Sequence, residues 1–100
     1  MPTSVVAVAK TFKVPQGAAV LDVRRLQNPH RAIRAKELSE DLDAIEAWLR
    51  RDARACERLD ALVERGRRCA QDTLYVVCHG GKHRSQVVAR LVREAGACER

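Results

Sequence analysis

The sequence predicts an α/β fold: a small mixed or partly parallel sheet of three to four strands, packed by about three helices. This prediction rests on the order of its patterns, which runs strand, strand, two helices, strand, helix. Helical crossovers of this kind favour parallel strand pairing. The length of the chain indicates the number of domains. Its 100 residues, without a repeat or a linker, make one domain, residues 1–100.

The N-terminal part supplies two strands. Residues 5–9 are a β-compatible run that we extend as far as Phe12, and residues 15–17 (Pro-Gln-Gly) mark a turn. Residues 19–24 read as a second, largely buried strand with a polar end, and residues 27–30 form a loop.

Two helical patterns follow. Ser39 is the expected N-cap of the first, in which Leu42, Ile45 and Leu49 recur on one face. We expect a break at 52–55 and a second helical stretch that ends at 66–70.

The C-terminal part predicts a strand over 74–78 and a last helix over 85–95. Gly96 is placed at the C′ position just beyond that helix.

The net charge of +6 favours polyanionic partners, although part of it follows from acidic residues at helix starts and arginines at helix ends.

No apolar run approaches the ~18 residues of a membrane span. No signal peptide is evident, so we expect a cytoplasmic protein and no membrane partner. The four cysteines show no Cys-x-x-Cys pair and no regular ligand spacing, and we expect no metal and no cofactor.

The four cysteines differ in their expected roles. Cys56 and Cys69 lie among helical positions and are expected to be structural thiols. Among the four, only Cys78 stands where chemistry could use it, at the end of the predicted third strand.

The most informative segment follows that strand: His79-Gly80-Gly81-Lys82-His83-Arg84-Ser85. Glycines after a strand let main-chain N–H groups turn inward, and the next helix presents its positive dipole end to an anion. Arg84 adds a bidentate fork and Lys82 a point charge. The segment therefore predicts a phosphate-binding loop.

The polar end of the second strand adds further candidates. Ligands of such sheets gather beyond the carboxyl ends of the strands. If both strands end there, Asp22, Arg24, Asn28 and His30 lie towards Gly80, Lys82 and Arg84.

The loop is not a Walker A motif, because Val76 stands where the first glycine is needed and His83 follows Lys82. It does resemble the Cys-x-x-Gly-x-x-Arg-Ser loop of cysteine-dependent phosphatases. In that interpretation the Cys78 thiolate attacks phosphorus, Arg84 grips the phosphoryl oxygens and Asp22 is the candidate general acid. The histidine that usually precedes the cysteine is replaced by Val77.

A second resemblance covers nearly the whole chain. The stretches Phe12-Lys13, Leu21-Asp22-Val23-Arg24, Asn28-Pro29-His30 and Cys78 to Ser85 occur in this order in the RapZ C-terminal domain family. The chain departs from the family at Arg25 and Gln27, which replace a Phe and a Pro, and at His79, which replaces a Thr.

This resemblance implies a domain like a phosphofructokinase subdomain, in an adaptor that binds RNA and senses an amino-sugar phosphate. It implies a phosphosugar pocket lined by Asp22, His30, Gly80 and Arg84, with Lys82, His83 and Ser85 at its rim.

The leading hypothesis is therefore a regulatory module that binds a phosphorylated small molecule, RNA, or both, and the alternative is a cysteine phosphatase. A homo-oligomer is left open. The ligand-binding candidates are Asp22, Arg24, Asn28, His30, His79, Gly80, Gly81, Lys82, His83, Arg84 and Ser85.

Overall fold

Three parallel strands form the sheet of this protein, whose computed structural model describes residues 2–27, 41–80 and 82–98. They are β1 (Ser4–Ala9), β2 (Ala19–Asp22) and β3 (Thr73–Cys78), in the order β1-β3-β2. Both neighbouring pairs are parallel, so the α/β prediction is confirmed and the sheet is parallel throughout the described part. Strand β1 ends before Phe12 and β2 ends at Asp22, so both are shorter than predicted.

The central strand β3 alternates strictly between its two faces. Leu74, Val76 and Cys78 are buried, whereas the residues between them are partly buried. The parallel register places Val5 beside Leu74 and Leu21 beside Val76, so these side chains share one face. That face forms the floor of the core.

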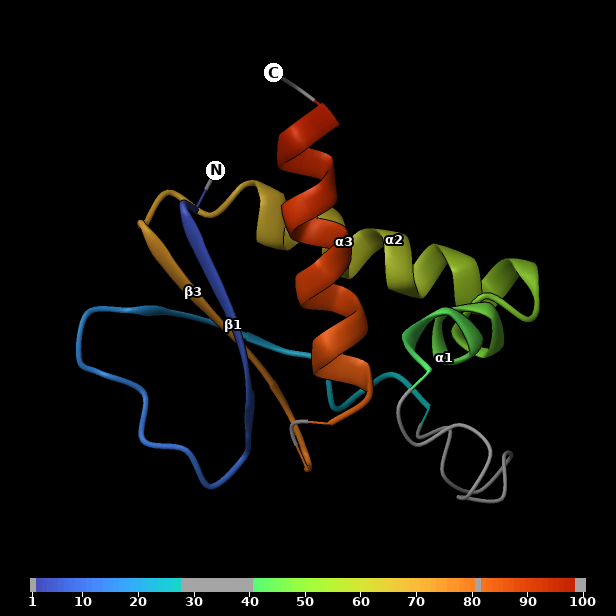
Figure 1. Cartoon of the computed structure of the whole chain (residues 1–100), viewed down its shortest axis with the longest axis horizontal. Coiled ribbons are helices and arrows are strands. Elements are labelled where there is room, and N and C mark those ends of the chain that lie inside the picture. The colour runs from blue at the N-terminus through green and yellow to red at the C-terminus, as the bar shows by residue number, and fades with distance from the viewer. Residues whose placement is uncertain (1, 28–40, 81, 99–100) are drawn as a thin grey trace.

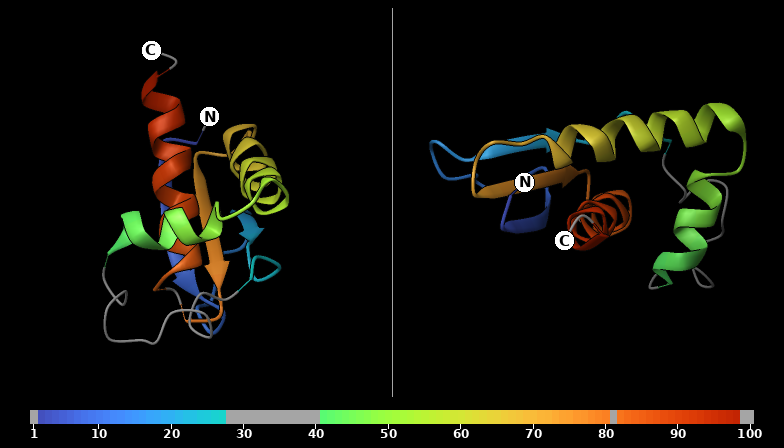
Figure 2. Two further views of the ribbon diagram at one scale, coloured as in Figure 1. Left: turned by 90° about the vertical axis from the view of Figure 1, so that its right-hand side faces the viewer. Right: turned by 90° about the horizontal axis from the view of Figure 1, so that it is seen from above.

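The described residues also form three helices: α1 (Leu42–Leu49), α2 (Ala53–Arg67) and α3 (Arg84–Cys98). Helix α3 packs on β1 and β3, α2 packs on α3 and β2, and α1 contacts both other helices (Figure 1). The views in Figure 2 place α2 and α3 on the same side of the sheet. The fully buried side chains Leu59, Val87, Val88 and Val92 come from their inner faces.

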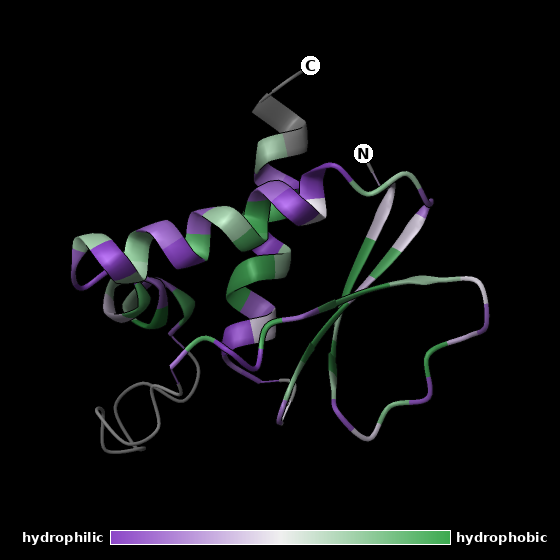
Figure 3. Cartoon of the chain, turned by 180° about the vertical axis from the view of Figure 1, so that it is seen from behind, coloured by the Kyte–Doolittle hydropathy of each residue, from purple (hydrophilic) through white to green (hydrophobic). Residues whose placement is uncertain are grey.

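Polar and apolar residues alternate around α2, as Figure 3 shows, with the apolar ones towards the rest of the core. This is the amphipathic pattern expected of a helix that covers a sheet. In the described residues, no helix is long and apolar enough to cross a bilayer.

The helix boundaries correct two predictions and confirm a third. Helix α1 is capped by Asp41, whose carboxylate accepts from the N–H groups of Asp43 and Ala44, whereas the predicted cap, Ser39, lies outside the described residues. Asp52 caps α2 and so confirms the predicted break. Gly96 lies inside α3, which continues to Cys98, so its placement beyond the helix is wrong.

Close helix packing explains Gly66, a buried residue in the last turn of α2. A Cβ atom at this position would lie 2.8 Å from Val92 Cγ2 and 3.2 Å from Leu74 Cδ2. Only glycine therefore lets α2 approach α3 and the sheet this closely.

The sheet face away from the helices carries a different cover. The segment 10–18 returns the chain from β1 to β2 on that side (Figure 2). Phe12 of this segment stacks on Tyr75 of β3, with ring centroids 5.4 Å apart.

Ion pairs between helices account for part of the arginine excess. Arg90 of α3 contacts Asp43 and Glu46 of α1, each at 3.0 Å. Arg50 bridges Glu46 at 3.1 Å and Asp60 of α2 at 2.9 Å, and its bond to Asp60 raises the pKa of Arg50. Several arginines thus serve the fold and not an external polyanion.

Candidate phosphate-binding loop

The loop between β3 and α3 lies beyond the carboxyl end of the central strand. His79, Gly80 and Lys82 are exposed, and His83 is partly buried. The carbonyl of His79 accepts a hydrogen bond from the Lys10 N–H at 3.4 Å, which ties the start of the loop to the end of β1. The loop is therefore held at its base while its polar groups face solvent.

Helix α3 begins directly after this loop. The carbonyl of His83 accepts the first helical bond, from the Val87 N–H at 3.0 Å. As in every α-helix, the first N–H groups, here those of Arg84 and Ser85, have no acceptor within the helix. They lie at the positive end of the dipole of a 15-residue helix.

Arg84, at the first position of α3, is anchored to the segment that follows β2. Its side chain is buried (6% exposed). Its Nη1 donates to the carbonyl oxygens of Arg24 at 2.9 Å and Leu26 at 3.0 Å. The guanidinium therefore joins the ends of β2 and β3 and keeps its charge beside the start of α3.

Ser85 and Cys78 form a buried polar pair beneath the loop. The Cys78 thiol (2% exposed) lies 3.0 Å from the Ser85 hydroxyl (0% exposed). Both groups belong to the core side of the loop, so neither presents its side chain to solvent. This contact fixes the first turn of α3 against the last residue of β3.

Gly80 differs from Gly66 in its surroundings. A Cβ atom at Gly80 would meet no atom within 4 Å, and its φ is not in the left-handed region. The described fold thus places no steric demand on the absence of a side chain here. A glycine that the chain does not need for folding is typical of a site where a ligand approaches the backbone.

Asp22 and Arg24 pair with each other instead of facing the loop. Asp22 accepts two bonds from Arg24 Nε at 3.0 Å and one from Nη2 at 2.7 Å. The Arg24 hydrogen bond lowers the pKa of Asp22. In the strand register Asp22 lies on the face of Val20 and Tyr75, opposite α3.

The predicted site residues therefore fall into three groups. His79, Gly80, Lys82 and His83 gather at the start of α3, with Arg84 and Ser85 behind them. Asp22 ends β2 at the same end of the sheet, but it lies on the other face and pairs with Arg24. Asn28, His30 and Gly81 lie outside the described residues.

Two functional groups escaped the sequence analysis: the main-chain carbonyls of Arg24 and Leu26 that receive Arg84. Carbonyl groups occur at every residue, so no sequence pattern marks those two. The motif predicted an arginine for phosphate and gave no sign of its anchoring role.

The family model described as "RapZ C-terminal domain" matches residues 5–99. No curated protein matches the chain.

Proposed function

The chain belongs to the RapZ C-terminal domain family, and on that premise we propose that it is a binding module for phosphorylated ligands. The ligand is a phosphosugar-like metabolite, an RNA phosphate, or both, bound at the loop between β3 and α3. The exposed, basic loop at the N-terminus of α3, with open space around Gly80, is the observation that carries this proposal.

The local charge suits an anion. The segment His79 to Gln86 contains Lys82, Arg84 and two histidines, and it contains no carboxylate. Main-chain N–H groups at a helix start bind phosphate without a dedicated side chain. We assign the phosphate to the space over Gly80, with Lys82 at the rim.

Arg84 acts in this proposal mainly as a fixed charge. Its Nη1 is engaged by two carbonyl groups, so it favours the anion by proximity and by holding the loop in place. Of the remaining candidates, Asp22, His30 and Ser85 are assigned to the site by the family resemblance, and Arg24, Asn28 and Gly81 by their positions in the sequence alone.

A bulky residue at Gly80 tests the assignment. Gly80→Val fills the open space above the loop, and we expect at least a roughly tenfold loss of affinity, or ~1.4 kcal/mol. Isothermal titration with inorganic phosphate, a hexose phosphate and an amino-sugar phosphate measures it. Gly80→Ala is the graded control, with a smaller loss, and both variants should unfold at the wild-type urea concentration. Wild-type phosphate affinity in Gly80→Val contradicts the proposal.

RNA is distinguished from a small phosphate by its salt response. Each phosphate contact along a nucleic acid releases counterions, so the affinity for an RNA hairpin should fall steeply with salt. Bases lack stacking partners on a chain with three aromatic residues, so we expect recognition of duplex or hairpin shape. A flat salt response removes RNA from the proposal and leaves the metabolite.

A cysteine phosphatase is the second candidate, and the contact between Cys78 and Ser85 favours it, because a hydroxyl donor stabilises a thiolate. The burial of Cys78 and the anchoring of Arg84 support the binding module better. We expect no hydrolysis of an aryl phosphate by the reduced protein, and unchanged phosphate affinity in Cys78→Ser. Turnover that disappears in Cys78→Ser identifies an enzyme instead.

A further inference from the structure

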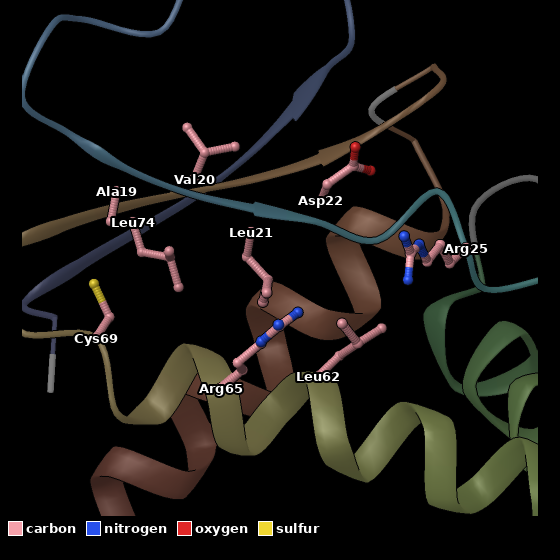
Figure 4. A pocket seen from close by; sticks show the side chains of 9 residues that line it. All are labelled: Ala19, Val20, Leu21, Asp22, Arg25, Leu62, Arg65, Cys69 and Leu74. Carbon is pink, nitrogen blue, oxygen red and sulfur yellow. The ribbon is translucent and has the colours of Figure 1, made fainter.

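A groove runs along β2, an outer strand of the described sheet, away from the loop between β3 and α3. Its volume is about 550 Å³, which is in the range of ligand-binding clefts. One wall is the whole of β2, residues 19–22, and the other is α2 (Figure 4). Leu21, Leu62 and Leu74 supply apolar side chains between the two walls, as the same figure shows.

The β2 wall offers main-chain hydrogen bonds. The Val23 N–H donates to the carbonyl of Val77 in β3 at 2.9 Å, so odd-numbered residues of this stretch face β3. In a strand, successive residues direct their main-chain groups to opposite edges. The N–H and C=O groups of Val20 and Asp22 therefore face outward, and no described backbone group bonds to them across that edge.

The groove also carries positive charge. Arg25 and Arg65 line it from its two walls and are both exposed. Neither forms an ion pair with any residue that the structure describes. The one carboxylate in the lining, Asp22, is paired with Arg24 at 2.7 Å and forms no ion pair with Arg25 or Arg65.

We propose that this groove binds an extended, acidic segment of a partner protein, which adds to the sheet as a strand beside β2. In strand addition, main-chain bonds give affinity and pockets for alternate side chains give specificity. Apolar side chains of the segment face Leu21 and Leu62, and its carboxylates face Arg25 and Arg65. The four residues of β2 offer an edge of about 13 Å.

The lining disfavours two other occupants. A second copy of the chain brings the same edge and the same two arginines, and its groove carboxylate is already paired. RNA stacks its bases on aromatic side chains, and the lining contains none.

The probe is a short fluorescein-labelled peptide in which valine and glutamate take turns at every second position, with threonine between them, so that both side chains face the groove. It is compared with the same peptide carrying lysine in place of glutamate. Fluorescence anisotropy should show binding of the glutamate peptide alone. Hydrogen exchange followed by NMR should then slow at the Val20 and Asp22 amides. Equal binding of both peptides, or saturation without slower exchange at these amides, overturns the proposal.

Two variants test separately how charge and how the main-chain groups of β2 contribute to peptide binding. Arg65→Glu should weaken binding of the glutamate peptide at least roughly tenfold, while Arg54→Glu, an exposed arginine on α2 outside the groove, should leave it within about twofold. Val20→Pro removes an outward N–H and should abolish binding. The variant should still fold, since proline is tolerated in an edge strand. If Val20→Pro does not fold, the comparison of Arg65→Glu with Arg54→Glu tests the proposal.

The other occupants leave distinct signatures. Protection of the Val20 and Asp22 amides that rises with protein concentration, without peptide, identifies a second copy and overturns the proposal. The proposal is also overturned if an RNA hairpin protects the Val20 and Asp22 amides from exchange more strongly than the glutamate peptide does. Arg65→Glu should bind inorganic phosphate as the wild type does, which keeps this test separate from that of the phosphate loop.

Discussion

Arg84→Ala is expected to lower the free energy of unfolding by about 2–4 kcal/mol, because a charged donor to two carbonyl groups is lost. One of the orphaned carbonyls, that of Leu26, is reached in a buried contact and regains little solvation. Urea denaturation followed by circular dichroism measures the change. In conditions where the variant is folded, phosphate affinity should also fall roughly ten- to a hundredfold.

Arg84→Lys separates the two roles of the guanidinium. The lysine keeps the charge near α3 but has a single nitrogen for two carbonyls, so stability should fall while most of the phosphate affinity remains. Arg58→Ala, an exposed residue of α2, is the matched control and should change stability by no more than about 0.5 kcal/mol. An Arg84→Ala protein with wild-type stability would show that the anchoring contact is unimportant.

Gly66→Ala should destabilise the protein by up to about 2 kcal/mol, although alanine is the better helix former. The helix preference favours the substitution by about 1 kcal/mol, while overpacking a tight core costs about 1–3 kcal/mol. Overpacking outweighs the helix preference because the Cβ atom would lie 2.8 Å from Val92, a fully buried β-branched residue with a restricted rotamer. Gly66→Val should have the larger effect of the two, measured by the same unfolding experiment.

A double-mutant cycle checks the cause of the Gly66 effect. In the Val92→Ala background the obstructing methyl group is gone, so Gly66→Ala should cost less or become stabilising. Gly80→Ala, where a Cβ meets no atom within 4 Å, is the control and should be close to neutral for stability. Additive effects at positions 66 and 92 would place the strain elsewhere.

Much of the fold follows from local patterns in the sequence. The β-compatible run at residues 5–9 and the short apolar run at 74–78 predict two strands to within a residue or two. Asp52 marks the break between α1 and α2 because a carboxylate at the N-cap satisfies a helix N–H, here that of Ala55. The polar loop after β3 likewise predicts a helix start, since glycine and a basic turn separate strand from helix.

The errors arise where two local signals compete or where the deciding contact is distant. Asp41 caps α1 although Ser39 is an equally good capping residue by type. Gly96 resembles a helix stop, but glycine inside a helix costs only about 1 kcal/mol and α3 continues past it. The anchoring of Arg84 depends on carbonyl groups 58 and 60 residues away, and the β2 groove on Arg25 and Arg65, which only the fold brings together.

The central claim is that phosphate binds to main-chain N–H groups where β3 meets α3. Nitrogen-15 NMR of the full chain, titrated with inorganic phosphate and an amino-sugar phosphate, tests it most directly. The account predicts saturable shifts centred on the amides of Gly80, Lys82, His83, Arg84 and Ser85, with those of β1 unchanged. Saturable phosphate shifts confined to another surface, with these five amides unmoved, would contradict it.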